Sequence, residues 1–158
     1  MIVGVLKEPL PETRVSLLPE HVGILNKWNV TVHIEDGAGE RSYANNEKYA
    51  DAGATLASRD EVLQHADIIL TINNPGAGDT DMLKGKILFG LFQPLYNSRE
   101  VQDWAQKGVT VFSIDMLPRT TRAQSMDVLS SQANIAGYKA VLQASYLFPK
   151  YFPMFMTA

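Results

Sequence analysis

The sequence predicts a doubly wound α/β fold, because short β-branched and aliphatic runs alternate with amphipathic stretches of about ten residues. We interpret five such runs as strands, at residues 2–6, 30–34, 66–72, 86–91 and 109–114. Helical patterns lie between them, at residues 19–28, 46–52, 59–65 and 98–107. Right-handed βαβ connections would then place helices on both faces of a mostly parallel sheet of the flavodoxin-like or Rossmann-like kind.

Local signals mark the ends of several of these elements. Ser58 and Ser98 stand where N-caps belong, and each offers a hydroxyl acceptor to the first helical N–H groups. Gly53 and Gly108 stand where a helix C-terminus favours a left-handed residue. The aliphatic run at 68–70 has no polar alternation, which indicates a strand buried on both faces.

The C-terminal part of the chain has a different pattern. From Leu129 to about Phe148 the apolar spacing predicts one long helix. Aromatic residues and methionines crowd the last thirteen positions, where chain ends are normally polar. We therefore expect an α/β lobe over residues 1–128, and over 129–158 a long helix and an apolar tail that a further domain covers. Folding of this tail onto the chain's own core is the alternative.

Composition excludes several classes of protein. The 158 residues, 46% of them hydrophobic, suit one globular domain, and a net charge of -3 gives no sign of nucleic-acid binding. The absence of cysteine excludes disulfides, a thiolate nucleophile and a cysteine zinc site. No run reaches membrane-spanning length, so we expect a soluble chain, and the absence of cysteine is compatible with the reducing cytoplasm. The three histidines lack metal-type spacing, and no hydrolase or phosphate-loop motif occurs, so we expect neither a metal nor an acid-base catalytic group.

The segment 117–138 is dense in hydrogen-bonding groups and precedes the long helix. Arg119 and Arg122 supply planar cationic forks, Gln124 supplies an amide, and Asp127 and Ser130 lie three residues apart. Such a set could bind a carboxamide and a phosphate. In the alternative interpretation, Asp127 and Ser130 only cap a helix while the arginines cover surface.

Two further places could bind a ligand near the carboxyl ends of strands. Arg14 and Lys7 follow the first strand and could bind a carboxylate, because open α/β sheets place ligands at this edge. A structural role for Arg14 is the alternative. The run 37–39, Gly-Ala-Gly, superficially opens a phosphate loop, but Ser42 replaces the third glycine, which favours a plain turn.

Three motifs carry a resemblance to a known family. The runs at 4–8, 12–15 and 35–40 resemble the N-terminal domain of alanine dehydrogenases and nicotinamide nucleotide transhydrogenases. The runs at 118–127 and 130–138 resemble the transhydrogenase branch in particular. The branch similarity disfavours amino-acid dehydrogenation, as do Thr71 and Leu91, which stand approximately where alanine dehydrogenases place a substrate-binding lysine and a histidine.

The resemblance implies the first lobe of the NAD(H)-binding α subunit of a proton-translocating transhydrogenase. It implies that Arg119, Gln124, Asp127 and Ser130 approach the nicotinamide and position it, without acid-base roles. A Rossmann lobe of the same subunit would complete the NAD(H) site, while a partner subunit binds NADP(H) and another component spans the inner membrane. The resemblance also implies a homodimer, peripheral to that membrane, and a chain that is inactive without its second lobe. The alternatives are a stand-alone small-ligand or interaction module, and a fragment of an alanine- or saccharopine-type dehydrogenase.

Overall fold

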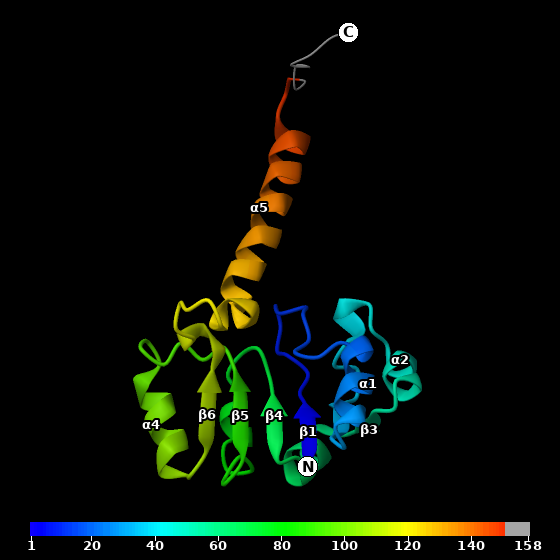
Figure 1. The fold of residues 1–158 in the computed structure, drawn as a ribbon, viewed down its shortest axis with the longest axis vertical. Helices are drawn as coiled ribbons and strands as arrows, with labels where there is room; N and C mark the ends of the chain where they lie inside the picture. Colours follow the sequence, from blue (N-terminus) through cyan, green and yellow to red (C-terminus); the bar gives the residue numbers. More distant parts are fainter. Residues whose placement is uncertain (151–158) are drawn as a thin grey trace. The chain divides into compact units, whose positions relative to one another are not determined.

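The structure is a computed structural model, and it describes residues 1–150 of the chain. Internal contacts divide the chain into two compact units, the first spanning Met1–Met116 and the second beginning at Leu117 (Figure 1). The lobe over 1–128 and the helix and tail over 129–158 stay predictions.

The first unit is built on a six-stranded, entirely parallel sheet in the order β3-β2-β1-β4-β5-β6 (Figure 1). This is the order of the Rossmann fold, and it confirms the predicted doubly wound class. All five predicted strands are present, whereas β3 was not predicted because its three residues, Thr-Leu-Ala, form no apolar run. The strands are β1 (Ile2–Val5), β2 (Thr31–Glu35), β3 (Thr55–Ala57), β4 (Ile68–Leu70), β5 (Ile87–Gly90) and β6 (Thr110–Ser113).

Four helices and two short 3-10 turns connect these strands, and a third 3-10 turn follows β6. Three of the predicted ends are confirmed: Ser58 forms a capping box with Glu61, and Gly53 and Gly108 have φ angles of +88° and +73° just past their helices. The prediction that Ser98 is an N-cap is wrong, because the cap residue is Asn97, whose side chain donates instead to the Phe92 carbonyl. The elements are α1 (Pro19–Lys27), α2 (Asn46–Asp51), α3 (Arg59–His65), α4 (Ser98–Gln106), η1 (Glu40–Ser42), η2 (Ala77–Asp79) and η3 (Ile114–Met116).

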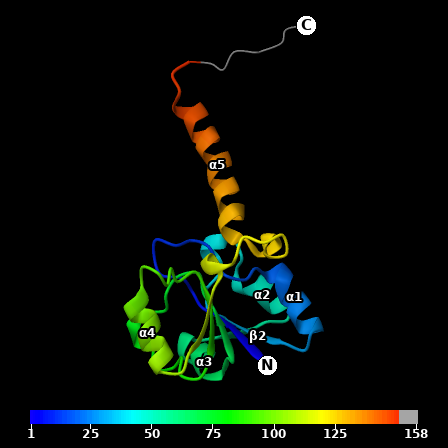
Figure 2. The same cartoon turned by 60° about the vertical axis from the view of Figure 1, so that its left-hand side comes forward.

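Helices lie on both faces of the sheet (Figure 2). Each face carries a separate hydrophobic cluster. Under α1 and α2 the cluster centres on Val22, Ile34 and Tyr49. Under α3 and α4 it centres on Ile69 and Trp104, and the Trp104 ring meets Phe92 edge to face with centroids 5.3 Å apart. The prediction that β4 is buried on both faces is only half right. Ile69 is fully buried, but Ile68 and Leu70 point to the opposite face and are half-buried.

The second unit contains a 3-10 turn, η4 (Ala123–Met126), and one long helix, α5 (Val128–Leu147). The predicted long helix is therefore confirmed. No residue of α5 is buried, and Lys139 is its only charged residue. Of the apolar tail, Tyr146 is 84% exposed, while the aromatic residues and methionines beyond position 150 lie outside the described residues.

Candidate functional site

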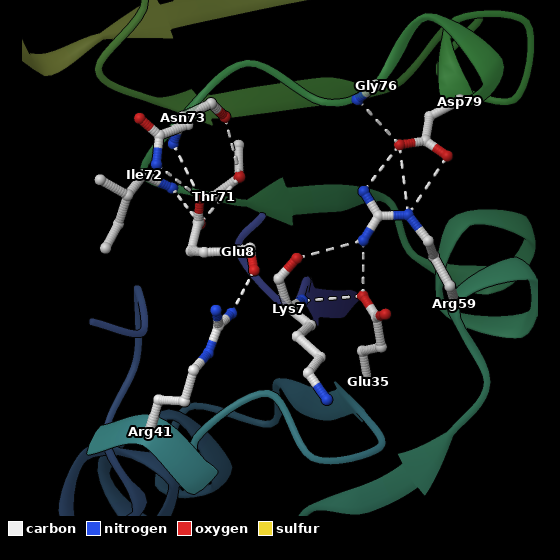
Figure 3. Close-up of polar contacts among 10 residues, drawn as sticks. All are labelled: Lys7, Glu8, Glu35, Arg41, Arg59, Thr71, Ile72, Asn73, Gly76 and Asp79. Carbon is white, nitrogen blue, oxygen red and sulfur yellow. Dashed lines mark hydrogen bonds and ion pairs between the residues drawn. The ribbon is translucent and has the colours of Figure 1, made fainter. Parts of the chain in front are cut away.

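The polar centre of the first unit lies where β1 and β4 are neighbours. The chain leaves these two strands in opposite directions across the sheet, and open α/β sheets bind ligands at such a switch point, beyond the carboxyl ends of the strands. A pocket of about 390 Å³ lies at this place. Its lining comes from the ends of β1, β2 and β4, from the start of α3, and from η2 with the loop before it. The lining residues are Lys7, Glu8, Pro9, Glu35, Arg59, Thr71, Asn74, Pro75, Gly76 and Asp79. Figure 3 shows the polar contacts around this place.

Glu8 closes one side of this pocket and is 2% exposed. One carboxylate oxygen accepts from the Thr71 hydroxyl at 3.0 Å and from the Ile72 N–H at 2.5 Å (Figure 3). The other accepts from the Asn73 N–H and from its side-chain amide, both at 3.0 Å. A buried carboxylate needs such a set of donors, because each lost bond would leave charge without solvation. Glu8 thereby ties the end of β1 to the loop that follows β4.

Arg59 joins three further segments at the other side of the pocket (Figure 3). Its guanidinium forms a 2.7 Å ion pair with Glu35 at the end of β2 and another with Asp79 in η2. It also donates to the Lys7 carbonyl at 3.3 Å. Burial by itself lowers the pKa of Arg59, but the hydrogen bond to Asp79 and the charge of Glu35 outweigh it and raise that pKa. The arginine is therefore held as a permanent cation between two carboxylates.

The two predicted carboxylate-binding residues have different surroundings. Arg14 forms a 2.6 Å ion pair with Glu12, and this hydrogen bond lowers the pKa of the Glu12 carboxyl to about 2. Lys7 donates its backbone N–H to Glu35 at 2.7 Å, and its ammonium makes no hydrogen bond or ion pair within residues 1–150. Of the two, Lys7 lines the switch-point pocket and Arg14 does not.

The polar segment of the second unit folds as consecutive turns. The Thr120 carbonyl accepts from the N–H groups of Ala123 and Gln124, both at 3.1 Å, which starts η4. Asp127 is the N-cap of α5: its carboxylate accepts from the Ser130 N–H at 3.0 Å and from the Ser130 hydroxyl at 2.6 Å. These bonds, with the charge of Arg119, lower the pKa of the Asp127 carboxyl. Asp127 and Ser130 therefore cap α5.

The side chains of Arg119 and Gln124 are exposed and form no hydrogen bond within the described part of the chain. Their donors and acceptors are thus open to a ligand, next to a helix N-terminus that Asp127 fixes in place. An amide and a guanidinium are suited to the amide and phosphate groups of a nicotinamide nucleotide. The segment can position such a group, and the pKa of its one carboxyl group, that of Asp127, is lowered.

The glycine run at 37–39 has a structural role. The Gly37–Gly39 run is a turn, as predicted: Gly37 has φ +69° and donates its N–H to Asn46, and a short 3-10 turn follows instead of a longer helix. Residues 1–150 contain no group of three or more acidic, cysteine or histidine side chains placed to hold a metal ion. Within the same residues, no helix has the length and apolar character needed to cross a bilayer.

Sequence reasoning missed the Glu8 and Arg59 networks. In the sequence Glu8 stands out only as a member of a motif, and Asp79 only as a member of a loop. The available signal was the position of Lys7 and Glu8 directly after the first strand, where the switch-point rule places polar groups.

The strand order and the polar crevice at the switch point define a Rossmann-type α/β lobe. The chain belongs to the family of alanine dehydrogenase/PNT N-terminal domains, whose pattern matches residues 4–136. The first part of the NAD(P) transhydrogenase subunit alpha from Rickettsia prowazekii is 38% identical over the whole of this chain and 43% of its own length. A crystal structure of transhydrogenase from Sinorhizobium meliloti superposes with a TM-score of 0.92 at 39% identity, covering all of this chain and 48% of that one.

Similarity to alanine dehydrogenases is lower. Alanine dehydrogenase 1 from Staphylococcus aureus is 27% identical over 92% of this chain and 39% of its own length. The chain thus spans less than half the length of these relatives, and within the family it is more similar to the transhydrogenase branch.

Proposed function

We propose that this chain is the N-terminal lobe of the NAD(H)-binding component of a proton-translocating NAD(P) transhydrogenase. The observation that carries the proposal is the polar segment before α5, whose Arg119 and Gln124 side chains are exposed and form no hydrogen bond within residues 1–150. Similarity over the whole chain to a transhydrogenase subunit supports it. A lobe that spans 43% of such a subunit would be inactive without the remainder.

In this proposal four residues form the nicotinamide side of the NAD(H) site. Gln124 would pair with the carboxamide, since an amide both donates and accepts, and Arg119 would stabilise a phosphate or the amide oxygen. Asp127 and Ser130 would hold the turn at the start of α5, because their mutual hydrogen bonds fix its first residues. The nicotinamide supplies the hydride chemistry, so the lobe contributes alignment of the ring and exclusion of water.

The wider assembly follows from the same proposal. A Rossmann lobe of the same subunit would hold the rest of NAD(H), and a separate subunit would hold NADP(H). Within the complex, the NAD(H)-binding component would be a homodimer. It would lie at the cytoplasmic side of the inner membrane, attached to that membrane through the membrane-spanning component.

The test is hydride transfer in the complete complex with Gln124→Ala. Loss of ring alignment should slow single-turnover hydride transfer by at least about tenfold, with a smaller change in NADH affinity. Gln106→Ala, an exposed glutamine on α4, is the matched control and should change neither quantity. Equal rates for the two variants would remove the assignment of Gln124.

Titration of NADH into the 158-residue chain, with and without the second lobe, tests the half-site. Binding only in the mixture supports a shared site. Firm binding by the chain alone would instead favour a stand-alone module.

A second candidate function is binding of a small carboxylate at the switch-point pocket. The ammonium of Lys7, which lines this pocket, favours it, whereas Arg14 lies outside the lining and is paired with Glu12. Against it, Glu8, Glu35 and Asp79 outnumber the cations Lys7 and Arg59 in the lining. Calorimetry with pyruvate tests this second function. Pyruvate binding that Lys7→Gln abolishes would support it.

A further inference from the structure

Arg122 is a cation of the second unit to which the proposed NAD(H) site gives no role. Its side chain is exposed and forms no hydrogen bond or ion pair within the described part of the chain. The other cations of this unit are Arg119, Lys139 and Lys150, and its one acidic side chain is Asp127. The charge of Arg119 helps to lower the pKa of Asp127, whereas Arg122 has no such effect. The charge of Arg122 is therefore left without a partner in this lobe.

The backbone that carries Arg122 is held in place by local hydrogen bonds. The Thr120 carbonyl accepts from the Ala123 N–H at 3.1 Å, and the Arg122 carbonyl accepts from the Ser125 hydroxyl at 3.4 Å. Arg122 has helical angles, φ -68° and ψ -38°, at the start of η4, which directly precedes α5 (Figure 1). The next residue, Ala123, is 6% exposed. The guanidinium thus projects into solvent from a turn with a defined conformation.

Arg122 and Gln124 leave this turn on different sides. A 3-10 turn has three residues per turn, so side chains two positions apart are rotated by about 120°, while those three positions apart are aligned. Arg122 is therefore on the side of Ser125 and not on the side of Gln124. Because Gln124 faces the nicotinamide in the proposed function, Arg122 lies beside the nicotinamide site and not in its wall.

Hydride transfer requires a second subunit to approach this same place. The two nicotinamide rings must come within about 3–3.5 Å of each other, so the NADP(H)-binding subunit must cover the surroundings of the residues that hold the first ring. A standard interface buries about 800 Å² on each partner, which corresponds to a disc of about 16 Å radius. Arg122 lies within about 8 Å of Gln124 along the backbone. Lys139, in contrast, lies about 18 Å along α5 from Asp127. Arg122 is thus inside the expected contact area.

We propose that Arg122 binds an anionic group, a carboxylate or a phosphate, on the NADP(H)-binding subunit and so docks that subunit against the nicotinamide. The inference rests on the proposed function, which places NADP(H) on a separate subunit. A guanidinium suits this role, because it is always charged and its planar fork can bind either anion with two hydrogen bonds. No bond within the described part of the lobe has to break before docking. Arg122 is then a positioning residue that sets the affinity between subunits, whereas Gln124 aligns the ring.

The test is hydride transfer between the complete NAD(H)-binding subunit, carrying Arg122→Gln, and a separately prepared NADP(H)-binding subunit. The rate is measured against the concentration of the second subunit. We expect the half-saturating concentration to rise at least about tenfold and the saturating rate to change less than about twofold, because the lost charge acts on association. The NADH affinity of the variant, measured by calorimetry, should stay within about twofold of the wild type.

Two matched variants and the salt dependence separate this role from a general loss of charge. Arg122→Lys keeps the cation and should recover part of the lost affinity between subunits. Arg99→Gln removes an exposed arginine from α4 and should leave the rates and both affinities unchanged. Added salt should weaken docking of the wild type more than docking of Arg122→Gln, because an exposed ion pair is screened.

The nucleotide bound to the second subunit distinguishes the two possible anions. If Arg122→Gln weakens docking of the nucleotide-free subunit as well, the anion is a carboxylate of that protein. If docking is weakened only when NADP(+) is bound, the anion is a phosphate of the nucleotide. Both results support the proposal.

Three results would overturn it. An unchanged half-saturating concentration would mean that Arg122 does not contact the second subunit. A tenfold fall in NADH affinity would place Arg122 in the NAD(H) site instead. A lower saturating rate with unchanged docking would make it a ring-aligning residue. The proposed function fails separately, if the wild-type subunits transfer no hydride, whereas wild-type transfer that equals that of Arg122→Gln refutes only the docking role.

Discussion

Replacing Glu8 by glutamine should destabilise the first unit strongly, although the two side chains have nearly the same shape. The glutamine can keep an oxygen toward the two donors of Asn73, which leaves its NH2 group facing the Ile72 N–H and the Thr71 hydroxyl. The hydroxyl can turn and accept, because Thr71 can donate to the Asn73 carbonyl at 2.9 Å instead. The backbone N–H of Ile72 has no such alternative.

The expected loss of stability can be worked out from these contacts. One buried N–H left unsatisfied costs about 1–3 kcal/mol, and the loss of charge weakens the remaining bonds, so we expect about 2–4 kcal/mol in total. That is a large fraction of the roughly 5–15 kcal/mol that stabilises a domain. In urea, with m of about 1–3 kcal/mol per molar, the midpoint should fall by about 1–2 M.

The assay is urea unfolding followed by circular dichroism, with Glu47→Gln as the control. Glu47 is exposed in the first turn of α2, so its substitution should cost less than about 1 kcal/mol. If Glu8→Gln and Glu47→Gln shift the midpoint equally, the buried hydrogen bonds of Glu8 do not stabilise the fold.

Further predictions concern stability and titration at Tyr49, Glu12 and Gly39. Tyr49→Phe removes a 2.7 Å hydrogen bond to the Leu17 carbonyl and should cost about 1 kcal/mol in thermal unfolding. Burial, and secondarily the charge of Glu20, raises the pKa of Tyr49 to about 12. Stability should therefore fall as pH rises from 10 toward 12, because only the native tyrosine keeps its proton, and ultraviolet titration should find one late tyrosine. The hydrogen bond from Arg14 lowers the pKa of Glu12 to about 2, so this pair stabilises the fold above pH 4.5 and loses its effect as pH falls toward 2. Arg14→Ala should return the Glu12 pKa, read by carboxyl NMR, to its ordinary range. Gly39→Ala would place a Cβ 2.5 Å from the Ala44 carbonyl oxygen and 2.7 Å from the Tyr49 ring, so Tm should drop by at least about 3 °C.

Local sequence patterns were enough to predict most helices and strands of the first unit. The strands and helices were predictable because each carries its own periodicity, and Ser58 and the two C-terminal glycines were predictable because capping is a contact between near neighbours. Strand β3 was not predicted, because a three-residue edge strand is defined by its pairing with β2 and not by its own composition. Ser98 was misassigned because two adjacent residues, Asn97 and Ser98, are both acceptable caps, and only the contact of Asn97 with Phe92 separates them.

The site was less predictable, because its central contacts join residues far apart in sequence. Arg59 meets Glu35 and Asp79 across 24 and 20 positions, and Glu8 meets Asn73 across 65. Such pairs depend on strand order and register, which periodicity does not reveal. The turn before α5 was predictable as a polar cluster, since Asp127 and Ser130 are three residues apart on one helix start.

The composition of α5 has a practical consequence for the chain in solution. Twenty helical residues with one charged side chain and none buried present apolar surface on every side to water. Such a helix gains free energy from any association that covers it, so the unfolding midpoint of the isolated chain should rise with protein concentration. The stability and the ligand affinity measured on this chain therefore depend on the protein concentration. Variants must be compared at the same concentration.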